Sequence, residues 1–134
     1  MLGGRPVIGL TFATALSDHD RADLPGPVCF LTPAQALRTY GVDWATALQG
    51  TVQDWCPDSL LVVDATAAPG FAMRAVLSGL KTLYCPEEDP AYRDLRAYAD
   101  AHGAGVLNHC PTPQDHWTPH VPTRKRKRVA KSDT

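Results

Sequence analysis

Three side chains able to do acid–base or nucleophilic chemistry each follow a short apolar run: the carboxylate of Asp64, the thiol of Cys85 and the imidazole of His109. A carboxylate beside an imidazole can exchange protons with a substrate, and a thiol beside an imidazole can attack one. If the chain is an enzyme, we expect these three residues to be catalytic and the substrate to be an anionic metabolite. The alternative, which we favour for the thiol and the imidazole, is a small core cysteine and a polar residue ending a strand.

Cys85, His109 and Cys110 also have the side-chain types of a zinc site. Structural zinc sites usually contribute ligands in pairs two to four residues apart, and no such pair occurs here. The adjacent His109 and Cys110 can seldom both reach one ion. We therefore predict no metal site and no cofactor.

The loop from Asp64 to Gly70 precedes a predicted helix that begins near Pro69-Gly70. The unpaired N–H groups of a helix start can hold an anion, so Thr66 and Gly70 are candidate anion-binding residues. The loop has neither the spacing of a dinucleotide-binding GxGxxG nor that of a phosphate-binding P-loop. The favoured alternative is structural: Asp64 and Thr66 cap the turn and the helix.

The stretch from Pro57 to Asp64, followed by Pro69-Gly70, resembles the middle of a bacterial receiver domain. That resemblance implies a phosphoacceptor at Asp64. A receiver also needs an acidic pair after its first strand, where this chain has Thr11-Phe12-Ala13. It needs Ser or Thr after the fourth strand and Lys after the fifth, where this chain has Tyr84-Cys85 and Asn108-His109. We therefore claim no family and expect no phosphorylation chemistry.

Strand-like and helix-like segments alternate along the chain and determine where these side chains lie. Apolar runs predict strands near residues 7–12, 28–31, 59–63, 81–85 and 106–108. Helical patterns fill residues 32–55, with a break near Gly41 and Thr32-Pro33 as the predicted start, and two later segments that begin near 69 and 89. Helices between strands imply parallel pairing. We predict a single three-layer α/β domain with a roughly five-stranded, mainly parallel sheet and helices on both faces. In such a sheet Thr32, Asp64, Cys85 and His109 share one edge.

Length and composition place the chain among globular proteins. It has 134 residues, of which 44% are hydrophobic and 20% charged, enough for one core. We predict an α/β domain over residues 1–110, a Pro-rich extended segment over 111–123, where four prolines oppose regular structure, and a disordered basic tail over 124–134. Trp117 is expected to pin the extended segment to the domain.

The tail carries an opposite charge to the rest of the chain. Residues 124–134 hold six basic side chains and one acidic side chain, a net charge of +5, whereas the other 123 residues hold 7 basic and 13 acidic ones, a net charge of −6. The run Arg124, Lys125, Arg126, Lys127 and Arg128 can attract nucleic acid or another polyanion, an anionic membrane surface or an acidic protein through counterion release. The alternatives are a merely solvated tail and one that folds back on its own body.

Four cysteines without a CxxC pair predict buried free thiols rather than a disulfide framework. No run is long enough to cross a bilayer and no secretory pattern is evident, which favours a cytoplasmic location. We predict a small non-catalytic binding or accessory module that acts through protein–protein contacts, with the tail engaging an anionic partner. A homo-oligomer is compatible with this hypothesis. A small enzyme or enzyme subunit with its site at the sheet edge is the alternative.

Overall fold

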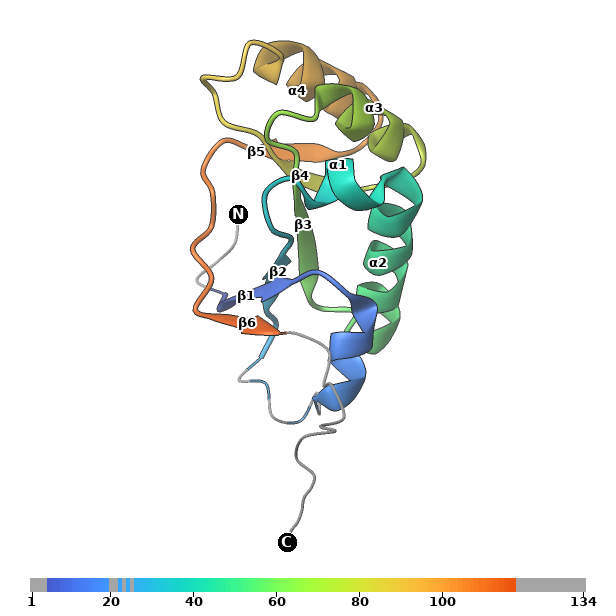
Figure 1. The fold of residues 1–134 in the computed structure, drawn as a ribbon, viewed down its shortest axis with the longest axis vertical. Coiled ribbons are helices and arrows are strands. Elements are labelled where there is room, and N and C mark those ends of the chain that lie inside the picture. The colour runs from blue at the N-terminus through green and yellow to red at the C-terminus, as the bar shows by residue number, and fades with distance from the viewer. Residues whose placement is uncertain (1–4, 20–21, 23, 25, 118–134) are drawn as a thin grey trace, which may run out of the picture.

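The computed structural model describes residues 5–19, 22, 24 and 26–117. Within these residues there are six strands, and helical segments separate all of them except β5 and β6, which follow one another directly (Figure 1). The strands are β1 Val7–Leu10, β2 Cys29–Leu31, β3 Leu60–Asp64, β4 Thr82–Tyr84, β5 Gly105–Leu107 and β6 Asp115–Trp117. The helices are the 3₁₀ helix η1 Ala13–Asp18 and the α-helices α1 Ala36–Tyr40, α2 Val42–Trp55, α3 Pro69–Leu77 and α4 Tyr92–Ala101.

All six strands pair in parallel in the order β5-β4-β3-β2-β1-β6. The predicted α/β class and parallel sheet are therefore confirmed. The prediction that residues 111–123 form no regular structure was wrong for residues 115–117, which form β6. Pro113 and Pro119 lie on either side of this strand in the sequence and do not interrupt it. The residue before the strand, Gln114, donates its backbone N–H to the carbonyl of Val7 at 2.7 Å.

The helices lie on one face of the sheet, which corrects the prediction of helices on both faces (Figure 1). From β1 to β5 the chain advances by one strand at a time in the same direction. Because parallel crossovers are right-handed, each helix is then placed on the same side. The described part of the domain therefore has two layers, a sheet and a row of helices, rather than three.

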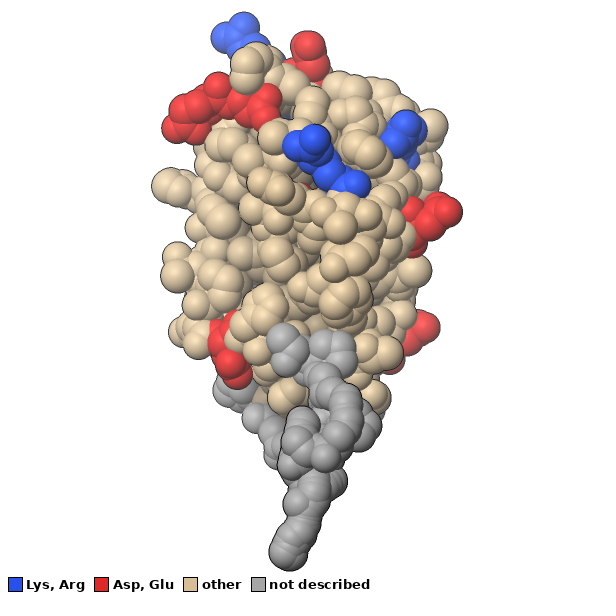
Figure 2. Space-filling model, viewed as in Figure 1, with Lys and Arg blue, Asp and Glu red and all other residues tan. Residues whose placement is uncertain are grey.

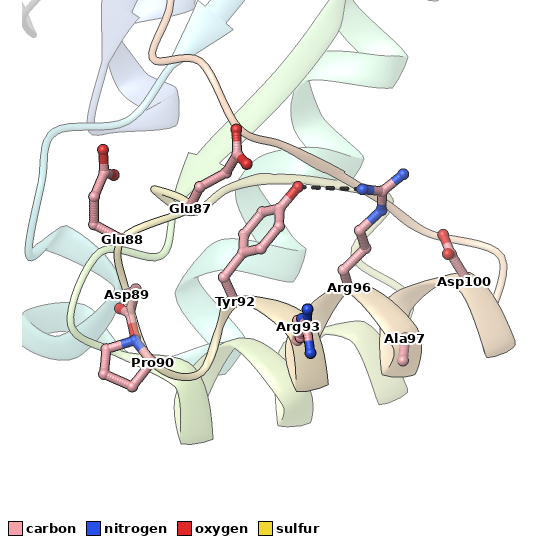
Figure 3. Close-up of a pocket in the computed structure, with 9 residues that line it drawn as sticks. All are labelled: Glu87, Glu88, Asp89, Pro90, Tyr92, Arg93, Arg96, Ala97 and Asp100. Atoms are coloured by element: carbon pink, nitrogen blue, oxygen red, sulfur yellow. Dashed lines mark hydrogen bonds between the residues drawn. The ribbon is translucent and has the colours of Figure 1, made fainter.

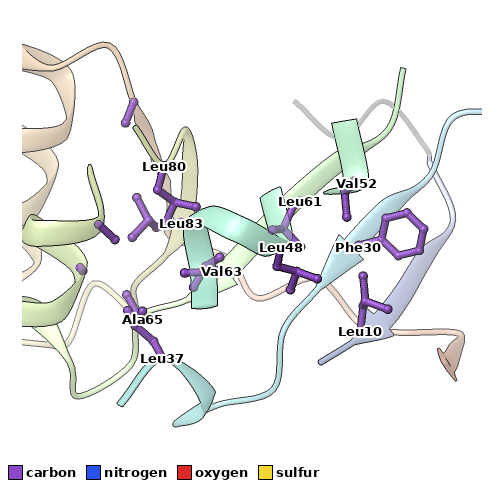
Figure 4. Close-up of a cluster of buried hydrophobic side chains, with 14 of the residues drawn as sticks. Leu10, Phe30, Leu37, Leu48, Val52, Leu61, Val63, Ala65, Leu80 and Leu83 are labelled. Atoms are coloured by element: carbon purple, nitrogen blue, oxygen red, sulfur yellow. The ribbon is translucent and has the colours of Figure 1, made fainter. Parts of the chain in front are cut away.

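The main core lies between these two layers. It combines alternate residues of the strands, such as Leu10, Phe30 and Val63, with Leu48 and Val52 of α2 (Figure 4). Side chains on a strand alternate between the two faces, so the intervening residues form a second, smaller cluster on the helix-free face. Its buried members are Val7, Cys29, Leu31 and Val62.

The connection from β5 to β6 runs on the side of the sheet away from the helices (Figure 1). A parallel sixth strand beside β1 requires the chain to return from the far end of β5 to the opposite edge of the sheet, and residues 108–114 make this return. Pro111 is buried in this segment. These residues therefore take the place that helices would have in a three-layer fold.

Two predicted helix signals have different outcomes. Thr32 does not start a helix: α1 begins at Ala36, after Gln35 in a left-handed conformation with φ 71°. The predicted break at Gly41 is confirmed, because its φ of 92° separates α1 from α2 and such an angle is easily adopted only by glycine. Within the described residues no helix is long and apolar enough to cross a membrane.

Candidate functional site

The carboxyl ends of β2, β3 and β4 meet at one edge of the sheet, where the sequence places Thr32, Asp64 and Cys85. Thr32 and Asp64 are in direct contact, since the hydroxyl of Thr32 accepts a hydrogen bond from the backbone N–H of Asp64 at 3.0 Å. Thr32 is 1% exposed, so its hydroxyl joins two neighbouring strands below the surface.

The Asp64 carboxylate stabilises the turn that follows β3. Its Oδ1 accepts hydrogen bonds from the backbone N–H of Thr66 at 2.9 Å and from the Thr66 hydroxyl at 2.6 Å. The side chain is only 6% exposed. This is the geometry of an Asx turn. Helix α3 begins later, after Ala68, with no side-chain cap. Asp64 and Thr66 therefore hold the loop rather than the helix start.

The same contacts affect the candidate anion site. Gly70 lies exposed in the first turn of α3, but the Thr66 hydroxyl already donates to a carboxylate. That negative charge would face an anion bound between Thr66 and the helix start. The arrangement is electrostatically unfavourable for an anion.

Asp64 and Cys85 leave the sheet on opposite faces. Val62 belongs to the cluster on the helix-free face, so Asp64, two residues later, points to that face. Cys85 instead belongs to the core under the helices. The two residues therefore share the edge formed by the carboxyl ends of the strands, but their side chains lie on opposite faces and cannot act together on one substrate.

The neighbours of Asp64 on the helix-free side are Tyr84 and Cys110, which the catalytic hypothesis did not include. Burial raises the pKa of the Tyr84 phenol, and the nearby charges of Cys110 and Asp64 raise it further. Burial and the charge of Asp64 likewise raise the pKa of the Cys110 thiol. The alternation of residues in β4 was the signal that could have placed Tyr84 beside Asp64.

The thiol of Cys85 is poorly suited to nucleophilic attack at neutral pH. Burial, followed by the negative charges of Asp89 and Asp64, raises its pKa to about 11. Because the thiolate is the reactive form, almost all of this group is protonated near pH 7. The four cysteines are free thiols, as predicted, but only Cys29 and Cys85 are buried. Cys56 is partly exposed and Cys110 is exposed, so the predicted burial is wrong for these two.

His109 is exposed in the segment that leaves β5. Within the described residues its ring takes part in no hydrogen bond, whereas the neighbouring Asn108 donates from Nδ2 to Oε1 of Glu87 at 2.8 Å. Among those residues no group of three or more His, Cys, Asp or Glu side chains is arranged to hold a metal ion. The structure therefore brings Thr32 and Asp64 together but not His109.

A cavity of about 600 Å³ lies beside the start of α4 (Figure 3). Its lining is mostly charged and comprises Glu87, Glu88, Asp89, Pro90, Tyr92, Arg93, Arg96, Ala97 and Asp100. The Tyr92 hydroxyl and the Arg96 guanidinium are 3.5 Å apart. The Oδ1 of Asp89 accepts a hydrogen bond from the backbone N–H of Ala91 at 2.9 Å, so this oxygen already has a partner within the protein. None of the predicted site residues lines this cavity.

Exposed aromatic side chains gather where β1 ends and α1 meets α2. We call Phe12, Tyr40 and Trp44 the aromatic patch. The ring centroids of Phe12 and Tyr40 are 5.2 Å apart in an edge-to-face arrangement, and those of Tyr40 and Trp44 are 5.5 Å apart. Phe12 is 39% exposed and Tyr40 is 47% exposed. The indole N–H of Trp44 donates to the carbonyl of Thr11 at 2.9 Å, which fixes the half-buried ring.

Sequence reasoning missed the aromatic patch. It assigned Phe12 to the end of a strand over residues 7–12 and placed Trp44 in the helical region of residues 32–55. The three residues become neighbours only because α1 and α2 pack beside the end of β1. The basic run of residues 124–128 lies outside the described residues.

No family model, no curated protein and no solved structure matches this chain.

Proposed function

We propose that this chain is a small, non-catalytic α/β binding module that acts through protein–protein contacts. The observation that carries the proposal is the aromatic patch, where two large rings stay 39% and 47% exposed. Large rings exposed side by side are typical of interaction sites, because aromatic side chains supply much of the binding energy at interfaces. Such a surface favours a partner with an apolar segment.

The distribution of charge supports the same choice. In Figure 2, Lys, Arg, Asp and Glu side chains lie over the end of the face where Figure 1 shows α1, α3 and α4, and along its margins, whereas the part where Figure 1 shows β1 and β2 is free of charge. Charged residues are depleted at the centre of protein interfaces. The enzyme alternative has weaker support, because Asp64 and Cys85 leave opposite faces of the sheet and the Cys85 thiol is protonated near pH 7. Four free thiols favour a cytosolic location.

Comparative capture from an extract of the native source tests the patch. Tyr40→Ser removes a 47% exposed ring from the patch, and the matched control Leu77→Ser removes a 65% exposed apolar side chain from the end of α3. We expect proteins captured by the unmodified chain to be lost with Tyr40→Ser and retained with Leu77→Ser. Identical capture by both variants would contradict the proposal.

We further propose that residues 124–128 add electrostatic attraction for an anionic partner. A fluorescently labelled single-stranded oligonucleotide serves as the polyanion probe. Replacing the five cations by Gln should reduce the slope of log K against log salt by about 3.5 in magnitude if each contacts one phosphate. The control replaces Arg93 and Arg96, exposed on α4, by Gln. Binding that the tail replacement leaves unchanged and salt-insensitive would refute this role.

A further inference from the structure

The cavity beside α4 is formed by two stretches of chain that follow one another. Residues 87–90, in the loop after β4, form one side, and one face of α4, from Tyr92 to Asp100, forms the other. The helical residues of the lining include pairs three or four positions apart, which lie together on the surface of a helix. The volume of about 600 Å³ is that of a site for a small molecule, for which about 300–1,000 Å³ is typical.

Tyr92 is a buried polar side chain that reaches this cavity. It is 8% exposed, and its ring packs in the core under the helices. In Figure 3 its hydroxyl is turned toward the side chains of Glu87 and Arg96. The Arg96 guanidinium donates to the phenolic oxygen at 3.5 Å, whereas the phenolic O–H has no acceptor within the described residues. This O–H is therefore able to donate to an oxygen atom of a ligand.

The two arginines of the lining have no carboxylate partner. Neither Arg93 nor Arg96 forms an ion pair within the part of the chain that the structure describes, although four acidic side chains line the same cavity. Arg96 lies beside the Tyr92 hydroxyl. A planar guanidinium can bind both oxygens of a carboxylate, and the neighbouring O–H adds a third donor. This end of the cavity therefore favours a carboxylate.

The acidic side chains of the lining favour a positive group in the same ligand. Glu87 accepts a hydrogen bond from Nδ2 of Asn108 through Oε1 at 2.8 Å, and its Oε2 has no such partner within the described residues. Glu88 is exposed and takes part in no hydrogen bond or ion pair there. Two guanidinium groups against four carboxylates give the lining a net charge of −2, which opposes a purely anionic ligand. A purely cationic ligand would leave Arg96 without a partner.

We propose that this cavity binds a small zwitterion with one carboxylate and one ammonium group, the chemistry that free amino acids and dipeptides share. Arg96 and the Tyr92 hydroxyl bind the carboxylate. Glu87 and Glu88, on the loop that precedes the helix, bind the ammonium group. No residue of the aromatic patch lines the cavity, so this binding is a property additional to the proposed protein contacts.

Nuclear magnetic resonance titration of the full-length protein with leucyl-leucine tests the site, with the side chains of Tyr92 and Arg96 as reporters. N-acetyl-leucyl-leucine lacks the ammonium group, and leucyl-leucine amide lacks the carboxylate. We expect each derivative to bind at least about fivefold more weakly, because each loses one contact between charged groups. Free leucine, titrated in the same way, distinguishes an amino acid site from a dipeptide site by which of the two binds more tightly. Equal affinity for leucyl-leucine and both derivatives would overturn the inference, as would Tyr92 and Arg96 resonances that millimolar leucyl-leucine does not move.

Variants assign the two ends of the site. Arg96→Gln should weaken binding of leucyl-leucine and its acetylated form but not of the amide, and Glu88→Gln should weaken binding of leucyl-leucine and the amide but not of the acetylated form. The matched controls, Arg38→Gln on α1 and Asp94→Asn on α4, are exposed and lie outside the lining, so they should change none of the affinities. Losses as large in the controls as in the cavity variants would refute the assignment. Tyr40→Ser should leave all probe binding unchanged, so this result and that of partner capture are independent.

Discussion

Replacing Asp64 by Ala tests whether this carboxylate acts as a structural group. The change removes the acceptor of two hydrogen bonds, from the backbone N–H and the hydroxyl of Thr66 at 2.9 and 2.6 Å. A hydrogen bond to a charged group contributes about 1.5–3 kcal/mol. Thr66 is half-buried, so water replaces part of the loss, and relief from burying a charge offsets another part. We expect a net loss of about 2 kcal/mol.

Urea unfolding followed by far-UV circular dichroism measures this loss. With a slope of about 2 kcal/mol per molar urea for a chain of this size, the midpoint should fall by about 1 M at unchanged slope. Asp64→Asn keeps an acceptor oxygen and should lose about half as much. The matched control is Asp54→Ala, an exposed aspartate on α2, which should change stability by less than about 0.5 kcal/mol.

An Asp64→Ala protein as stable as Asp54→Ala would refute this reasoning. It would mean that the buried carboxylate contributes no net stability to the turn. A functional role would then be needed to explain why Asp64, whose side chain is only 6% exposed, is charged. If Asp64→Ala loses the predicted amount of unfolding free energy, the role of Asp64 is structural.

Three further predictions concern the packing of the sheet. Burial raises the pKa of Cys29 and Cys85 to about 11, so mass spectrometry should find both thiols slow to react with iodoacetamide at pH 7.5 and faster as the pH approaches 11. Because the folded protein disfavours these thiolates, the two protonated thiols contribute their full stabilisation below about pH 8.5, and this contribution declines as the pH rises toward 11. An unfolding free energy that stays constant between these pH values would contradict the prediction. Gly9→Ala places a methyl group against the His116 imidazole and should cost about 1 kcal/mol in urea unfolding, most of it restored by His116→Ala; no restoration would refute the clash. Trp117→Ala should cost about 3 kcal/mol in the same assay, because the ring fills the space beside Phe30 and Trp55, and a loss below 1 kcal/mol would show that β6 is not held by this ring.

Much of the fold is predictable because it depends on local patterns. Short apolar runs separated by helical periodicity predict β2 to β5 and the helices between them, and parallel pairing follows from those connections. The break at Gly41 is likewise local, since its φ of 92° suits glycine. The signal for β6 is weak, because a three-residue strand between prolines has no periodicity to detect.

The side on which the helices lie is a tertiary property. It depends on the order β5-β4-β3-β2-β1-β6, and no local pattern encodes the order of strands in a sheet. That order also decides that residues 108–114 return along the helix-free face. Sequence reasoning expected helices there because the common doubly wound arrangement reverses direction within the sheet.

Local sequence patterns were enough to predict that Asp64 ends a buried strand, that the four cysteines are free thiols, and that a cationic run follows an acidic body. Which side chains become neighbours depends instead on how the strands and helices pack. The side-chain alternation of β3 and β4, together with the one-sided helix layer, sends Asp64 and Cys85 to opposite faces. Packing of α1 and α2 beside the end of β1 makes neighbours of Phe12, Tyr40 and Trp44. The physical reason is that side-chain proximity across elements depends on strand order and helix packing, which arise from the burial of the whole apolar surface at once.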